Sequence, residues 1–122
     1  MGLFSSSRNK DNGVNWINLT DENQLNALIE ESSSKAVVFF KHSIRCSISA
    51  MAKSRLESNW DLDADVTAVY LDLINYRTIS NLLAERFNIT HESPQIILVK
   101  NGQSIYNASH NQISVDAIKN QL

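Results

Sequence analysis

The feature that most constrains the fold of this chain is an uninterrupted apolar run at residues 36–40, Ala-Val-Val-Phe-Phe. A run of β-branched and aromatic residues without polar alternation is typical of a strand that is buried on both faces. Such a strand needs neighbouring strands beside it and further elements above and below it. The run therefore predicts a layered domain with this strand near its centre.

Length and composition narrow the class of protein. The chain has 122 residues, which is enough for one domain with a hydrophobic core and too few for two. Its net charge of -2 argues against nucleic acid as the main partner, because phosphate binding needs a basic surface. No apolar run approaches the roughly 20 residues that a membrane-spanning helix needs, so we expect no membrane partner.

The N-terminal residues 1–13 include three consecutive serines and an Asn-Gly pair, and we expect a flexible tail there. They lack the apolar core of a signal peptide, and a single cysteine fits a reducing compartment, so the expected location is the cytoplasm. The start also matches the short myristoylation pattern, which is too unspecific to change this expectation. Residues 14–122 would then form the folded domain.

Strand-like and helix-like patterns alternate along that domain. Strands are expected at residues 14–17, 36–40, 66–71, 95–99 and 104–107. Helices are expected after a cap at Thr20 or Asp21, at residues 46–59, at residues 78–87, and after a cap at Ser114. The pair Asn101-Gly102 predicts a tight hairpin turn. This order predicts an α/β domain with a mixed central sheet flanked by helices on both faces.

The helix expected at residues 46–59 has an apolar stripe. Ile48, Met51, Ala52 and Leu56 follow one another at helical spacing. We expect this stripe to face the core.

Cys46, the only cysteine, follows the buried strand after a short polar loop and opens this helix. The N–H groups and the dipole at a helix N-terminus favour a thiolate, which is the reactive form of cysteine. Lys41, His42 and Arg45 place positive charge nearby in the sequence, and the same effect is expected of them. Ser49 stands where a second cysteine would complete a disulfide-forming pair, and its hydroxyl can donate a hydrogen bond to the sulfur.

A lone thiol dictates the form of any exchange reaction. Attack of the Cys46 thiolate on a disulfide produces a mixed disulfide on Cys46. Because the chain has no other cysteine, a second, external thiol must remove that adduct. The sequence predicts monothiol exchange in two intermolecular steps, against the simpler interpretation of Cys46 as a small buried hydrophobe.

Two separated segments resemble the thioredoxin fold. The first is the apolar run at residues 36–40 with the loop that leads to Cys46. The second is Ser93-Pro94 followed by the strand-like residues 95–99 and the Asn-Gly turn. In thioredoxin-like proteins this proline is cis and packs beside the reactive sulfur, so the resemblance implies a cis Ser93–Pro94 bond close to Cys46.

Within that fold, residues 41–49 resemble a narrower family. They read Lys-His-Ser-Ile-Arg-Cys-Ser-Ile-Ser, which is similar to the approximate signature Lys-His-Ser-x-x-Cys-x-Ile-Ser of the bacillithiol-system monothiol proteins, the bacilliredoxin-like family. The resemblance extends from about Trp16 to the C-terminus. Family members commonly have proline or serine after the cysteine, and Ser47 leaves the helix start less rigid than proline would.

The resemblance implies a thiol–disulfide oxidoreductase without a cofactor. Its partners would be a low-molecular-weight thiol, bacillithiol-like, and S-thiolated proteins. The attacking residue would be Cys46, with Ser49 and Arg45 tuning its reactivity.

Four further residues are expected to bind the substrate. Ser93 and Pro94 would offer backbone contacts to the incoming disulfide. His42 and Ser47 flank the cysteine in the signature and would complete this set.

Two alternatives belong to other functional classes. A non-catalytic thioredoxin-fold module would use the same fold to bind a protein or to sense redox state. An iron–sulfur monothiol glutaredoxin would need a Cys-Gly-Phe-Ser motif, whereas residues 46–49 read Cys-Ser-Ile-Ser. His91 and His110 have no partners at metal-ligand spacing, so no metal site is expected.

Overall fold

A computed structural model of the chain describes residues 8–11 and 13–122. The strands in this part of the chain are β1 (Arg8–Asp11), β2 (Val14–Asn18), β3 (Ala36–His42), β4 (Val66–Asp72), β5 (Gln95–Lys100) and β6 (Gln103–Ser109). The helices are α2 (Glu22–Glu31), α3 (Ser47–Asn59), α4 (Arg77–Phe87), α5 (Val115–Lys119) and the 3-10 helix η1 (His110–Gln112). Strand and helix order agree with the sequence prediction from β2 onward.

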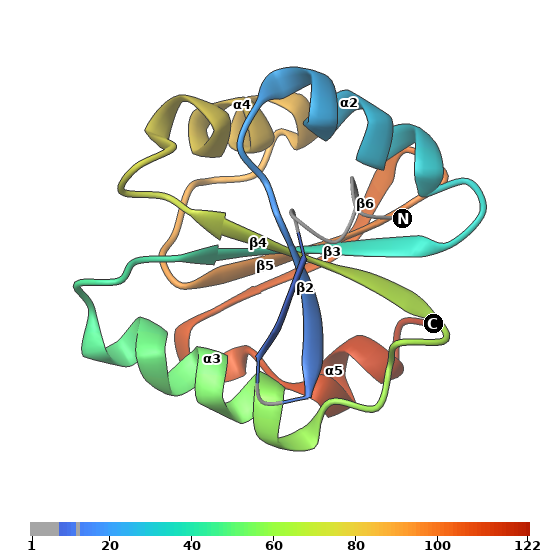
Figure 1. Ribbon diagram of the computed structural model, residues 1–122. Helices are drawn as coiled ribbons and strands as arrows, with labels where there is room; N and C mark the ends of the chain where they lie inside the picture. Colours follow the sequence, from blue (N-terminus) through green and yellow to red (C-terminus); the bar gives the residue numbers. More distant parts are fainter. Residues whose placement is uncertain (1–7, 12) are drawn as a thin grey trace.

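The described strands form one mixed sheet in the order β1-β2-β4-β3-β5-β6. Strands β2, β4 and β3 are parallel, and the pairs β3–β5, β5–β6 and β1–β2 are antiparallel. Helices α2 and α4 cover one face, and α3 and α5 cover the other (Figure 1). A mixed sheet with helices on both faces is the predicted architecture.

Strand β3 is the central strand, and all seven of its residues are buried. Successive side chains of a strand point to opposite faces of the sheet. Val37 and Phe39 join the core under α2 and α4, whereas Val38 and Phe40 join the core under α3 and α5. The same alternation separates the last two residues of the strand, so that Lys41 lies on the α2–α4 face and His42 on the α3–α5 face.

Local capping and turn signals are confirmed. The Asp21 side chain accepts a hydrogen bond from the Gln24 N–H at the start of α2. The Ser114 side chain caps α5 in the same way. Asn101 and Gly102 have φ angles of 54° and 75°, as the tight turn between β5 and β6 requires.

Strand β1 departs from the sequence prediction. Residues 8–11 were expected to belong to a flexible tail, yet they pair antiparallel with β2 through a turn at Gly13, whose φ is 99°. The strand is polar and lies at the edge of the sheet, where one partner suffices and no apolar alternation is needed. The rest of the expected tail, residues 1–7 and 12, lies outside the described residues.

Helix α3 presents a different face to the core from the one predicted. Ala52 and Leu56 are buried, but Ile48 and Met51 are 50% and 62% exposed. Ser49 and Glu57 are buried in their place. Polar partners explain why α3 turns Ser49 and Glu57 toward the core. Trp16 donates a hydrogen bond from Nε1 to Glu57 Oε2 over 2.9 Å. The buried partner of Ser49 is His42.

This orientation of α3 can be tested by stability. Leu56→Ala should lower the free energy of unfolding by about 2–5 kcal/mol, because it leaves a cavity in the core. Met51→Ala, the matched control on the same helix, should change it by less than about 0.5 kcal/mol. Urea unfolding of both variants measures the two values, and equal losses would show that Met51 also packs in the core.

Candidate active site

Cys46 is the N-cap residue of α3, as the sequence predicted for the start of this helix. Its backbone is extended, with φ -114° and ψ 122°, and its side chain makes no capping hydrogen bond. The cysteine is free and partly exposed. The sulfur is therefore available at a helix N-terminus and is not engaged in a local structural role there.

Ser49, three residues further on, is completely buried in the first turn of α3. Its Oγ accepts a hydrogen bond from the Ser43 N–H over 3.1 Å and lies 2.7 Å from His42 Nδ1. Among the described residues these are its side-chain partners, and Cys46 is not one of them. A hydrogen bond from Ser49 to the sulfur stays a prediction, and it would require the hydroxyl to turn from His42.

His42 is not a loop residue but the last residue of β3, and it is only 6% exposed. Its ring lies against the rings of Phe40 and Tyr70, with centroid distances of 5.6 and 5.5 Å. Burial lowers the pKa of His42, and Lys53 lowers it further. His42 is therefore neutral at pH 7, and it fixes the start of α3 through Ser49 while exposing little surface to a substrate.

Arg45 and Ser47 flank the cysteine on the surface. Both side chains are exposed, and Arg45 makes no ion pair or hydrogen bond with a described residue. Ser47 is the first residue of α3. Both side chains can therefore contact a molecule that approaches Cys46. That Arg45 tunes the reactivity of the thiol and that Ser47 binds the substrate stay predictions.

Lys41 does not take the position expected from the sequence. It is fully buried on the α2–α4 face, and its Nζ lies 3.1 Å from His91 Nδ1. Burial, followed by the charge of Arg77, lowers the pKa of Lys41 to about 8. The expectation that Lys41 adds charge beside the sulfur is therefore not supported, because the side chain leaves β3 on the face opposite α3.

The segment before β5 supplies the proline. The peptide bond between Ser93 and Pro94 is cis. Gln95, the next residue, pairs with Lys41 of β3, so this segment lies at the same end of the sheet as the loop to Cys46. The Ser93 hydroxyl is buried without a hydrogen-bond partner among the described residues. That Ser93 and Pro94 contact a substrate stays a prediction.

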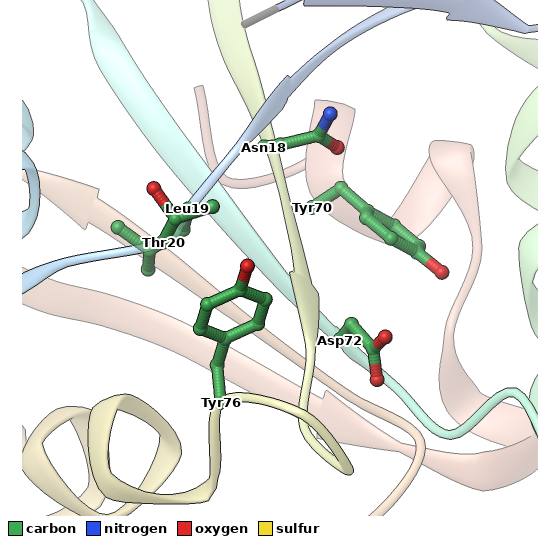
Figure 2. A pocket seen from close by; sticks show the side chains of 6 residues that line it. All are labelled: Asn18, Leu19, Thr20, Tyr70, Asp72 and Tyr76. Carbon is green, nitrogen blue, oxygen red and sulfur yellow. The ribbon is translucent and has the colours of Figure 1, made fainter.

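A cavity of about 290 Å³ lies near this end of the sheet. It is lined by Asn18, Leu19, Thr20, Tyr70, Asp72 and Tyr76 (Figure 2). Figure 2 shows Tyr70 and Asp72 leaving β4 on one side, while Tyr76 rises from the start of α4 toward Thr20. The Asp72 carboxylate accepts hydrogen bonds from Ile74 N–H and Asn75 Nδ2, so it shapes the turn after β4.

Three apolar side chains close to the cysteine in the sequence are exposed beside the polar ones. Ile44, Ile48 and Met51 are 58%, 50% and 62% exposed. Ile44 precedes Cys46 in the loop, and the other two lie on the outer side of α3. Sequence reasoning assigned Ile48 and Met51 to the core and so missed this apolar rim.

Two further observations bear on the class of site. Within the described parts of the chain, no three His, Cys, Asp or Glu side chains come together in a way that could hold a metal ion. None of the described helices combines the length and apolar character needed to cross a membrane. The chemistry available at this end of the sheet is that of a thiol, a buried histidine–serine pair and basic side chains.

Comparison with solved structures supports the fold. One structure, a thioredoxin-fold protein provisionally described as an oxidoreductase, is 32% identical, with a TM-score of 0.77 over 87% of this chain and 92% of that one. Mitochondrial thioredoxin 3 from Saccharomyces cerevisiae is 19% identical, with a TM-score of 0.67 over 84% and 89% of the two chains. Fasciola hepatica thioredoxin is 14% identical, with a TM-score of 0.71 over 86% and 98%. The last two show that the fold is that of thioredoxin.

Comparison with protein families is more specific. The family described as monothiol bacilliredoxin BrxC matches residues 17–118, which is most of the chain. The match includes the helix start at Cys46 and the cis Ser93–Pro94 bond. The family and the 32% identical structure together assign a thiol redox function. The chain, with its one cysteine at the N-cap of α3, thus belongs to the monothiol bacilliredoxin family.

Proposed function

We propose that the protein is a cytoplasmic monothiol oxidoreductase that removes low-molecular-weight thiols from S-thiolated proteins, with Cys46 as the nucleophile. The observation that carries this proposal is the position of the chain's only thiol. It is partly exposed at the N-cap of a 13-residue helix, and its sulfur makes no capping bond. A helix N-terminus favours the thiolate that attacks disulfides.

The reaction balances in two exchanges. In the first, the Cys46 thiolate attacks the small-thiol sulfur of a protein mixed disulfide; a Cys46–thiol disulfide forms, and the substrate protein leaves as a thiolate that takes up a proton. In the second, a free small thiol, as its thiolate, attacks the adduct, which releases the small-molecule disulfide and regenerates the Cys46 thiolate. The net reaction oxidises one free small thiol and reduces the protein cysteine.

The remaining predicted residues fit into this scheme by their positions. Arg45 and Ser47 are exposed and adjoin Cys46 in the chain, so an incoming disulfide would pass close to them. Ser93 and Pro94 would contact it through their backbone. The family resemblance supports bacillithiol as the small thiol, and His42 would act through Ser49 rather than by touching the substrate.

A second candidate function is favoured by the apolar rim of Ile44, Ile48 and Met51. A non-catalytic module could use this rim to bind a protein, with Cys46 only sensing redox state. Such a module would exchange thiols slowly, whereas the oxidoreductase would turn over. The two predictions below separate these functions.

The role of Cys46 can be tested by intact-mass measurement. The reduced wild-type protein, incubated with the disulfide of a small thiol, should gain the mass of one thiol adduct within minutes and lose it when free thiol is added. Cys46→Ala should gain nothing, because no other thiol exists in the chain. Ser54→Ala, the control at an exposed position further along α3, should still form the adduct. A wild-type protein that iodoacetamide alkylates but that forms no adduct would contradict the proposal.

The requirement for an external thiol can be tested by restoring a second cysteine. Ser49→Cys creates the Cys-x-x-Cys spacing of disulfide-forming pairs. Its adduct should therefore disappear without added thiol, and the protein should then weigh less than its reduced form by one pair of hydrogen atoms. Ser47→Cys is the matched control, because adjacent helix residues do not face each other. An adduct on Ser49→Cys that is as long-lived as on wild type would show that the two positions cannot exchange.

A further inference from the structure

His42 and Ser49 form a buried polar pair beneath the start of α3. His42 is 6% exposed and Ser49 is 0% exposed, and the atoms Nδ1 and Oγ lie 2.7 Å apart. Burial of a polar group is costly unless the group has a hydrogen-bond partner. Here each side chain is a partner of the other, so the position of the ring and the position of the hydroxyl depend on each other.

Ser49 connects this pair to the loop before Cys46. Its Oγ also accepts a hydrogen bond from the Ser43 N–H over 3.1 Å. The Ser43 carbonyl accepts a hydrogen bond from the Cys46 N–H over 3.2 Å, and the Cys46 carbonyl accepts one from the Ala50 N–H over 3.1 Å. The contacts therefore run without a break from the His42 ring to the backbone of Cys46.

The sheet fixes the other end of this series of contacts. His42 is the last residue of β3 and pairs with Asp72 of β4. Its carbonyl accepts a hydrogen bond from the Leu73 N–H over 3.1 Å, and its ring packs against the rings of Phe40 and Tyr70. Figure 1 shows the loop from β3 to α3 leaving the sheet at this end. Because both its backbone and its ring are held, His42 can anchor that loop.

The position of Cys46 relative to α3 controls the ionisation of its thiol. The side chain of an N-cap residue lies close to the free N–H groups of the first helical turn, and their partial positive charge favours a thiolate. This effect falls off within the first turn, so a loop that shifts or frays would lose it. Ser49 lies in that turn, three residues after the cysteine, and its side chain closes the loop back onto the helix.

We propose that His42 is a positioning residue for thiol exchange: through the Ser49 hydroxyl it holds Cys46 at the N-terminus of α3 and so maintains the thiolate. His42 touches neither the substrate nor the sulfur. Ser49 then acts on the backbone of the loop rather than as a hydrogen-bond donor to the sulfur. This inference rests on the proposed function, in which the thiolate attacks, and adds a residue that controls how much thiolate is present.

His42 is neutral in the pH range where a thiol ionises. The charged groups that act on it are Lys53 and Glu57 of α3 and Asp72 of β4. Burial, followed by Lys53, lowers the pKa of His42, and the opposing effects, of which that of Asp72 is the largest, do not reverse this shift. Above about pH 7, therefore, a pH profile of Cys46 reactivity reports the thiol and not the titration of His42.

The pH profile of Cys46 alkylation by iodoacetamide tests the role of His42. His42→Phe keeps an aromatic ring and removes the hydrogen bond to Ser49, so the midpoint of the profile should rise by about one pH unit, the size of a favourable helix-terminus effect. His42→Asn should return the midpoint toward that of wild type, because an amide oxygen or nitrogen can take the place of Nδ1. A midpoint that falls in His42→Phe would overturn the inference, because the released hydroxyl would then be a donor to the sulfur.

A double-mutant cycle shows whether His42 acts through Ser49. Ser49→Ala should raise the midpoint as His42→Phe does. The double variant should show no further rise, because both substitutions break the same series of contacts. Shifts that add up would mean that the two residues act independently, and they would overturn the inference.

A matched control separates positioning from a general loss of stability. Leu56→Ala weakens the core under the same helix and contributes nothing to the pair, so it should lower the melting temperature and leave the pH profile unchanged. Circular dichroism verifies the fold of each variant. An equal shift in Leu56→Ala would overturn positioning by His42.

The alkylation assay also separates this inference from the proposed function, because iodoacetamide needs no disulfide substrate. An unchanged profile in His42→Phe would overturn the positioning role but not thiol exchange. A wild-type protein that is alkylated but forms no adduct with a small disulfide would overturn the proposed function, and the role of His42 in exchange with it.

Discussion

The arrangement of the active-site end depends on the burial of β3 on both faces. β3 pairs with β4 on one side and β5 on the other, and all seven of its residues, including the last, are buried. Since its side chains alternate, the adjacent residues Lys41 and His42 enter two separate polar clusters. His42 joins Ser49 under α3, and Lys41 joins His91 beside α4. One strand end therefore supports both the cysteine helix and the segment before the cis proline.

Most of the fold could be predicted from the sequence because its signals are local. The apolar run of β3, the caps at Asp21 and Ser114 and the Asn-Gly turn each depend on a few neighbouring residues. β1 could not be found in this way, because a polar edge strand is stabilised by pairing with β2 rather than by its own pattern. The inward face of α3 depends likewise on distant partners of Ser49 and Glu57, so its apolar stripe was misleading.

The site was only partly predictable for a related reason. Cys46 could be placed at a helix start, but the predicted strand ended at residue 40 and left Lys41 and His42 in a loop. In the structure β3 continues through Lys41 and His42. Both side chains are therefore buried, and they point to opposite faces of the sheet. His91 is 50 residues from Lys41 in the sequence, so no spacing rule could have joined them.

Replacement of a second cysteine by Ser49 changes what the rest of the site must do. In a Cys-x-x-Cys protein the second thiol already lies beside the adduct, so it can remove the adduct without a further molecule. In the proposed reaction a free thiol from solution takes that role, so the site must admit a second molecule beside the adduct on Cys46. The partial exposure of Cys46, and the exposed Arg45 and Ser47 on either side of it in the chain, are compatible with the approach of that second molecule.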